Sequence, residues 1–303
     1  MGRYGMTVDN LLGVELVTAE GDVLTVDDRS HPDLFWALRG GGGNFGVATA
    51  FEYAAHPVAS VLGGIVAHPL DRAADVWSFY RDFTAAAPDE LTVFFGLVHA
   101  PDGSGQKLAV MPACHCGQSP EQAEAEVAAL RGFGPPVMDL IERMPYPKMN
   151  TLLDDAFPRG ALNYWKSAFL RELSEDVIQI MVERFEACPS PMTSMVLNPF
   201  HGAVNRVAID AMAMPHREFR YSLAILGQWA DPADNATMVA WTRTTFEALR
   251  PHMEEQSYVN DLSADDGDLI RWAYRSNWAR LVDVKRQYDP RNIFHLNQNI
   301  SPS

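Results

Sequence analysis

The feature that most constrains the fold of this chain is a run of four consecutive glycines within residues 39–47, which read RGGGGNFGV. Glycine loses more backbone entropy on folding than other residues, so such a run has to meet a requirement of the folded chain. That requirement is typically the close approach of a ligand or of another strand, which a Cβ atom would block. Gly41, Gly43 and Gly46 also satisfy the dinucleotide fingerprint GxGxxG, a match that depends on its context.

The context argues against a Rossmann site, because that fingerprint follows a strand and opens a helix. Residues 32–39 begin with a proline, which is typical of the first turn of a helix. Residues 47–53 alternate and carry β-branched and aromatic side chains, which is typical of a strand. No acidic residue for a ribose lies within 59–66. The predicted order of helix, glycine loop and strand permits nucleotide contact through backbone N–H groups, and a tight turn without a ligand is the alternative.

Composition narrows the possible partners. The formal net charge of −15 argues against nucleic acid, because phosphate binding needs a basic surface. No apolar run approaches the roughly 20 residues of a membrane helix, and residues 1–7 lack the apolar region of a signal peptide, so we expect a cytoplasmic protein without a membrane partner. The sequence Cys114-His115-Cys116 has no second Cys/His pair at zinc-site spacing, so structural thiols and no metal are expected.

From about residue 58 onward, the patterns indicate hairpin pairs of strands separated by amphipathic helices. The predicted helices cover 70–87, 119–131, 174–187 and 234–250, and the predicted strands cover 63–68, 91–100, 106–114, 192–198, 203–211 and 220–228. This pattern predicts an α+β fold with an antiparallel sheet covered by helices on one face. In the tail, the aromatic stripe predicts that Trp272, Trp278 and Leu281 pack into a helix core.

The motifs at both ends of the chain resemble one family. Residues 4–11 read YGxTxDNL, residues 17–21 read VTAxG, and residues 32–47 read PDLFWALRGGGGNFGV. The tail contains YVN at 258–260, NWxRLxxVKxxYDPxNxF at 277–294 and NQNI at 297–300, and the middle contains GAVNRV at 202–207 and PHR at 215–217. Together these motifs, spread over essentially the whole chain, resemble the berberine bridge enzyme-like FAD-linked oxidases of the vanillyl-alcohol oxidase superfamily.

The resemblance implies a bilobed flavoprotein. Residues 1–57 are expected to form the C-terminal part of an FAD-binding domain, residues 58–255 the substrate domain, and residues 256–303 a segment that returns to the FAD lobe. The implied reaction is hydride transfer to FAD from a CH–OH, amine or C–H group of a small organic substrate, with O2 as the electron acceptor. The flavin performs the redox step, and the protein contributes positioning, deprotonation and electrostatics.

Members of this family carry an additional N-terminal stretch with the first half of the FAD domain, including a His and often a Cys that bond covalently to the flavin. Only Met1, Gly2 and Arg3 precede the first matching residue here, so we expect a chain without covalent flavin attachment. Apolar surface that the missing half would cover is expected to favour self-association. The alternative is a non-catalytic remnant of the substrate domain that binds a ligand or a partner.

The resemblance also implies site residues. The expected FAD contacts are the backbone at Gly43, Asn44, Gly46 and Val47, with Tyr258, Asn260 and Asn297 near the flavin ring. Tyr274 matches a position where several members place a catalytic tyrosine, and packing within a helix is the alternative for it. A tyrosine has an ordinary pKa near 10, so as a base it needs a partner that lowers its pKa. His201 occupies the neighbourhood where some relatives place an assisting group.

Overall fold

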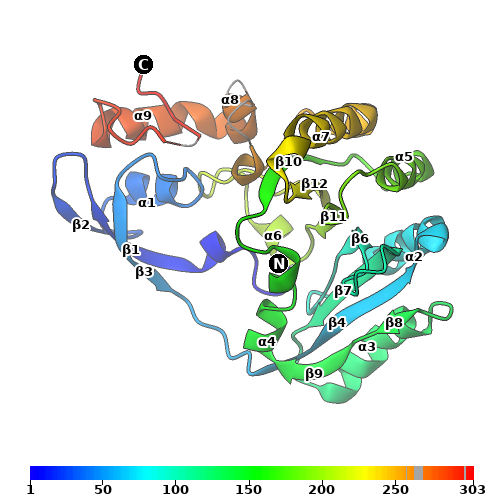
Figure 1. Cartoon of the computed structure of the whole chain (residues 1–303). Coiled ribbons are helices and arrows are strands. Elements are labelled where there is room, and N and C mark those ends of the chain that lie inside the picture. Colours follow the sequence, from blue (N-terminus) through cyan, green and yellow to red (C-terminus); the bar gives the residue numbers. More distant parts are fainter. Residues whose placement is uncertain (257, 263–268, 297) are drawn as a thin grey trace.

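The computed structural model describes residues 1–256, 258–262, 269–296 and 298–303. Residues 11–53 and the described residues from 258 onward come together in one group of elements, and the middle of the chain forms a second, larger group (Figure 1). Each group has its own large hydrophobic cluster.

The first group is built on a three-stranded antiparallel sheet with the order β2-β1-β3. Its strands are β1 (Leu11–Val17), β2 (Val23–Val26) and β3 (Val47–Tyr53). Helix α1 (Pro32–Leu38) packs against this sheet and helix α9 (Trp278–Tyr288) packs on α1, and the apolar side chains of both helices share one cluster with those of β1 and β2. Residues from positions 11 to 45 and 259 to 300 therefore form a single core.

The second group is built on a nine-stranded antiparallel sheet with the order β10-β12-β11-β6-β7-β4-β8, in which β5 pairs with β7 and β9 with β4. The strands are β4 (Ser60–Pro69), β5 (Leu91–Val93), β6 (Phe95–His99), β7 (Lys107–His115), β8 (Met138–Asp139), β9 (Glu142–Pro145), β10 (Leu162–Phe169), β11 (Ser194–Pro199) and β12 (Tyr221–Trp229).

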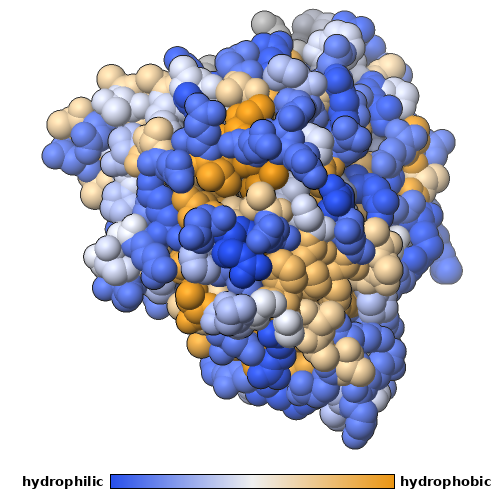
Figure 2. Space-filling view, turned by 90° about the vertical axis from the view of Figure 1, so that its right-hand side faces the viewer, coloured by the Kyte–Doolittle hydropathy of each residue, from blue (hydrophilic) through white to orange (hydrophobic). Residues whose placement is uncertain are grey.

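Four helices cover one face of this sheet: α2 (Ala73–Ala85), α3 (Pro120–Gly132), α5 (Glu175–Glu186) and α7 (Asn235–Leu249). Their amphipathic faces share one cluster with alternate strand residues such as Leu197 and Leu223. The predicted α+β class is confirmed, with helices on one face of an antiparallel sheet. Seen from the side of α2 and α5, hydrophobic surface lies in the centre and is bordered by hydrophilic side chains (Figure 2).

Short helices complete the chain: α4 (Tyr146–Asn150), α6 (Ala203–Arg206), α8 (Ile270–Tyr274), and the 3-10 turns at Thr7–Asn10, Leu70–Arg72, Asp154–Ala156, Pro232–Asp234, Arg250–His252, Val259–Asp261 and Arg275–Asn277. Within the described ranges, no helix has the length and apolarity that crossing a membrane requires.

Two local predictions are wrong. Residues 203–211 form α6 and the start of a loop instead of a strand. Trp272 is 62% exposed instead of packed in a core. The reason for the second error is a break between α8 and α9 at Arg275, which has a φ of 53°, so the face of α8 that bears Trp272 does not continue the buried face of α9.

Candidate cofactor and substrate site

The glycine loop joins the end of α1 to β3, and most of its glycines have a neighbour in this chain that requires them. Gly40 has a φ of +127°, and a Cβ atom there would lie 2.4 Å from the backbone nitrogen of Met214. At Gly46 a Cβ atom would lie 2.6 Å from the carbonyl oxygen of Val17 on β1. Gly41 is equally tight, with Ala37 O at 2.6 Å. These three glycines are explained by backbone packing within the chain.

Gly43 is different. A Cβ atom built on Gly43 meets nothing within 4 Å, and its φ does not lie in the left-handed region. Gly42 does adopt a φ of +66°, and both glycines are exposed. Within the described part of the chain, the amide N–H groups of Gly42 and Gly43 find no backbone acceptor. A ligand can therefore approach the backbone at this point, which fits a phosphate- or ring-bearing cofactor held by backbone N–H groups.

Asn44, predicted as a cofactor contact, uses its side chain inside the protein. Its Nδ2 donates to Gly41 O at 2.8 Å and to Gln298 O at 3.0 Å, and its Oδ1 accepts from the backbone N–H of Ile300 at 2.9 Å. The residue is buried. Its side chain ties the glycine loop to the C-terminal tail, and its carbonyl oxygen accepts from Lys285, so its backbone N–H is the group left for a ligand.

A buried lysine also connects the glycine loop to the C-terminal tail. Lys285 Nζ donates to Asn44 O at 2.7 Å, to Phe294 O at 2.6 Å and to Asp289 Oδ2 at 2.6 Å. Asp289 also accepts from the backbone N–H groups of Ile293 and Phe294, both at 2.8 Å. Burial acts to raise the pKa of Asp289, but the hydrogen bonds from Lys285 and these amides hold it below its usual range.

The buried Lys285–Asp289 ion pair was not predicted from the sequence. The spacing of Lys285 and Asp289 by one helical turn is a signal that could have found the pair, but the same spacing is common on solvated helix faces. Only the three-dimensional packing shows that both side chains are fully buried.

Val47, the last predicted contact of the loop, begins β3 and is 56% exposed. Phe51 and Tyr53 on the same strand are 57% and 44% exposed, with their rings stacked at 6.1 Å. Strand β3 is also an edge strand, since β1 is its single partner in the described sheet. The wall that carries the glycine loop therefore continues into an open apolar surface.

Tyr258 and Asn260, predicted to lie near a flavin ring, contact each other. Asn260 Nδ2 donates to the Tyr258 hydroxyl oxygen at 2.8 Å. The Tyr258 ring packs edge-on against His216, with centroids 5.8 Å apart. Burial and the nearby charge of Asp261 raise the pKa of Tyr258. Asn297, the other predicted ring contact, lies outside the described residues.

Tyr274 is buried at the end of α8, and its hydroxyl donates to Gly40 O at 3.1 Å. Burial, followed by the proximity of Tyr258, raises its pKa well above the usual value. In this structure the hydroxyl holds the start of the glycine loop.

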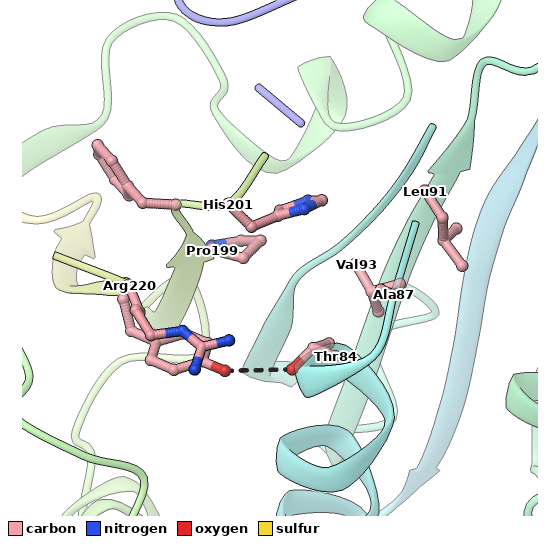
Figure 3. A pocket seen from close by; sticks show the side chains of 9 residues that line it. Thr84, Ala87, Leu91, Val93, Pro199, His201 and Arg220 are labelled. Carbon is pink, nitrogen blue, oxygen red and sulfur yellow. Dashed lines mark hydrogen bonds between the residues drawn. The ribbon is translucent and has the colours of Figure 1, made fainter. Parts of the chain in front are cut away.

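His201 follows β11 and lines a small pocket between the sheet and the end of α2. His201, Pro199 and Arg220 face Thr84, Ala87, Leu91 and Val93 across it (Figure 3). The half-buried His201 has a lowered pKa because of desolvation and the positive N-terminus. No hydrogen bond or ring contact between described residues joins His201 to Tyr274 or Tyr258, so the two predicted catalytic residues are not brought together by a direct contact.

The two groups of elements are linked by a loop that begins within residues 203–211, where a strand was expected. We call residues 207–217 the linking loop. The indole N–H of Trp36 donates to Asp210 O at 2.8 Å, and the backbone N–H of Met214 donates to Arg39 O at 3.1 Å. Asn277 Nδ2 donates to Met212 O at 3.0 Å. The linking loop thus contacts α1, the glycine loop and the turn before α9.

The end of the linking loop carries two buried basic residues. Arg217 pairs with Asp9, with Nη1–Oδ2 and Nη2–Oδ1 distances of 2.9 and 2.5 Å. His216 is fully buried between the rings of Phe169, Phe219 and Tyr258, and neither of its nitrogens has a hydrogen-bond partner among the described residues. Desolvation, followed by the charges of Arg275 and Arg217, lowers the pKa of His216 to about 3.

Among the described residues, no group of three or more His, Cys, Asp or Glu side chains could hold a metal ion. Cys114 and Cys116 are free thiols, and burial raises the pKa of Cys114 to about 11. His115 Nε2 lies 2.6 Å from Glu126 Oε2, which accounts for the histidine between them.

Comparisons with known proteins support the family resemblance. A family model described as "Berberine and berberine like" matches residues 257–301. An FAD-linked oxidoreductase of Dictyostelium discoideum is 29% identical over 98% of this chain and 64% of its own length. The (R)-6-hydroxynicotine oxidase of Paenarthrobacter nicotinovorans is 28% identical over 99% of this chain and 67% of its own length.

The fold has solved counterparts. The crystal structure of 6-hydroxy-D-nicotine oxidase from Arthrobacter nicotinovorans superposes with a TM-score of 0.85 at 25% identity, covering 99% of this chain and 68% of that one. The chain therefore spans about two thirds of the length of the proteins that it matches. The predicted relationship to berberine bridge enzyme-like FAD-linked oxidoreductases is confirmed.

Proposed function

We propose that this chain, a relative of the berberine bridge enzyme-like FAD-linked oxidoreductases, supplies one wall of an FAD site and the substrate domain of such an enzyme. The observation that carries the proposal is the open backbone at Gly43, which no neighbour in the described part of the chain explains. Residues 1–57 and 256–303 form the cofactor lobe in this proposal, and residues 58–255 form the substrate domain. The shared core of β1, α1 and α9 supports that division.

The cofactor contacts in this proposal are the backbone groups of Gly43, Asn44, Gly46 and Val47. The side chains of Tyr258 and Asn260 lie near the ring, together with Asn297. Exposed backbone N–H groups favour the negatively charged parts of a dinucleotide. When bound, FAD supplies the acceptor for a hydride from a CH–OH, amine or C–H group, and O2 is the proposed final electron acceptor.

Tyr274 remains our candidate for the catalytic base, but its surroundings favour a supporting role. A base has to lose its proton, and burial raises the pKa of Tyr274. Its hydroxyl is already used to hold Gly40 O. His201, the proposed assistant, lies in the pocket beside α2 and its lowered pKa makes it a neutral proton acceptor at pH 7.

A second candidate function is a binding module without catalysis. It is favoured by the exposed apolar side chains of β3, because a contiguous apolar surface commonly marks an interface. In that case, the chain binds a ligand or partner without FAD.

Flavin content distinguishes the two functions. The chain, and the same chain expressed together with the coding sequence upstream of Met1, are purified and titrated with FAD while flavin absorbance and fluorescence are recorded. We expect the lengthened protein to be yellow and this chain alone to bind FAD weakly. A lengthened protein that carries and binds no flavin rules out the oxidoreductase function, and a monomer that binds organic ligands without FAD favours the binding module.

A further inference from the structure

Asp261 is a partly buried carboxylate without a cationic partner among the described residues. It ends the 3-10 turn Val259–Asp261, which lies beside β10, and its Oδ2 accepts a hydrogen bond from Ser167 Oγ at 2.8 Å. Within the described ranges, no Lys, Arg or His forms an ion pair with it. The residues outside the described ranges are Ser, Asp, Asn, Ala and Gly, so they supply no cation either.

Desolvation of the Asp261 carboxylate costs free energy. A carboxylate that leaves water without a counter-charge is strongly disfavoured, and proteins normally pair buried charges. Desolvation raises the pKa of Asp261, and the hydrogen bond from Ser167 opposes this only in part. The charge of Asp261 also contributes to the raised pKa of Tyr258, which places the carboxylate near that phenol.

The row of sheet residues next to Asp261 has small, uncharged side chains. Ser167 pairs in register with Ala224, Ala224 with Val196, and Val196 with Gly96 across four neighbouring strands. The alternate residues of β11 and β12, such as Leu197 and Leu223, belong to the core beneath the helices. Because side chains alternate between the faces of a sheet, the row from Ser167 to Gly96 lies on the face away from the helices.

We propose that Asp261 binds the cationic nitrogen of the substrate, and that the substrate is a protonated amine with an apolar body. The ammonium group supplies the missing counter-charge, and the row of Ala224, Val196 and Gly96 accommodates the apolar body. The inference rests on the proposed function, because Tyr258 and Asn260, which precede Asp261, are the groups placed near the flavin ring. It assigns the substrate class of that site and a residue that determines specificity.

Two probes of similar shape test the assignment: benzylamine, which is cationic at pH 7, and benzyl alcohol, which is neutral. Binding of both to the folded chain is measured by protein NMR titration, with and without added FAD. We expect benzylamine to bind wild type about tenfold more tightly, a difference that corresponds to about 1.4 kcal/mol. In Asp261→Asn and in Asp261→Ser, we expect the two probes to bind with affinities that differ by no more than about twofold. Two different variants are used so that the test does not depend on the correct folding of either one.

The matched control is Asp28→Asn, which removes the same charge from a side chain that is 81% exposed. It should keep the wild-type preference, whereas Asp261→Glu, which retains the charge, should restore part of it. Equal binding of the two probes by wild type, or an unchanged preference in Asp261→Asn, overturns the proposal. FAD affinity measured in the same samples distinguishes the proposed FAD site from the proposed amine site. A preference for benzylamine without FAD binding refutes the FAD site alone, and FAD binding without that preference refutes the amine site alone.

Discussion

Gly40 and Gly43 lie in the same loop but have different surroundings. Gly40 is enclosed by Met214 of the linking loop, whereas Gly43 borders open space. A methyl group added to each glycine therefore tests packing at one position and ligand approach at the other.

We expect Gly40→Ala to lower the free energy of unfolding by roughly 1–3 kcal/mol, because its positive φ is strained for alanine and the Met214 backbone is too close. Gly43→Ala should change that free energy by less than about 0.5 kcal/mol, as expected of an exposed position. Urea denaturation followed by circular dichroism measures both. A Gly40→Ala protein as stable as wild type contradicts the packing explanation.

A larger side chain at Gly43 tests cofactor binding. With Gly43→Val, we expect FAD affinity to fall about tenfold, a loss of about 1.4 kcal/mol, because the branched side chain occupies the space that the ligand needs. Fluorescence titration of FAD into the protein, in the lengthened form where that binds more tightly, measures the change. Unaltered FAD affinity in Gly43→Val removes Gly43 from the proposed site.

His216 makes the stability of the protein depend on pH. Its pKa is about 3 in the folded chain and about 6.5 in an unfolded chain, so the unfolded state binds an additional proton between these values. The contribution of neutral His216 is fully present above pH 6.5 and is lost as the pH falls toward 3, with a slope of at most about 1.4 kcal/mol per pH unit. In His216→Phe, which keeps an aromatic ring, stability should fall less over this window in matched urea titrations. Identical pH profiles for the two proteins contradict the buried, neutral histidine.

At the scale of elements, α9 is fixed to the glycine loop by Lys285. Replacing it with methionine leaves the Asp289 carboxylate buried and without its cation, so we expect Lys285→Met to lose about 3–5 kcal/mol of unfolding free energy. The control is Arg286→Met on the same helix, whose exposed ion pair with Asp283 is worth at most about 1 kcal/mol. Equal losses of unfolding free energy in the two variants, measured by urea denaturation, contradict a stabilising role of the buried Lys285–Asp289 pair.

Local sequence patterns predicted the elements that local chemistry determines. The proline at position 32 and the alternation after Gly46 correctly indicated α1 and β3. Residues 203–211 were misjudged because Asn205 donates to Arg217 O and Phe219 O, and because the loop that follows finds its partners on α1. Those partners lie far away in the sequence, and tertiary contacts override local propensity there.

The site was predictable to a similar extent. The glycines and the YVN motif predicted contacts with a cofactor, and these contacts stay a prediction. The glycine pattern did not show that Gly40, Gly41 and Gly46 serve packing within the protein. Asp261 and His216 carry no local sign of burial, since each stands among polar or mixed neighbours. Their environments depend on β10 and on the linking loop, which meet them only in the folded chain.

On the scale of the whole molecule, the linking loop and the Arg217–Asp9 pair join the two groups of elements, while β3 leaves apolar surface uncovered. An edge strand with exposed Phe51 and Tyr53 presents unpaired backbone groups beside apolar side chains, a combination that favours association with another chain. We therefore propose that copies of this chain associate through β3.

Sedimentation velocity over a range of protein concentrations tests the association. The double change Phe51→Ser and Tyr53→Ser should raise the apparent dissociation constant at least about tenfold, equivalent to about 1.4 kcal/mol, because it removes apolar area without touching the buried core. The matched control, Leu153→Ser with Phe157→Ser, alters two exposed apolar side chains of the larger group and should leave the association unchanged. A wild-type protein that stays monomeric at every concentration, or a control that disrupts association as strongly, shows that β3 is not the interface.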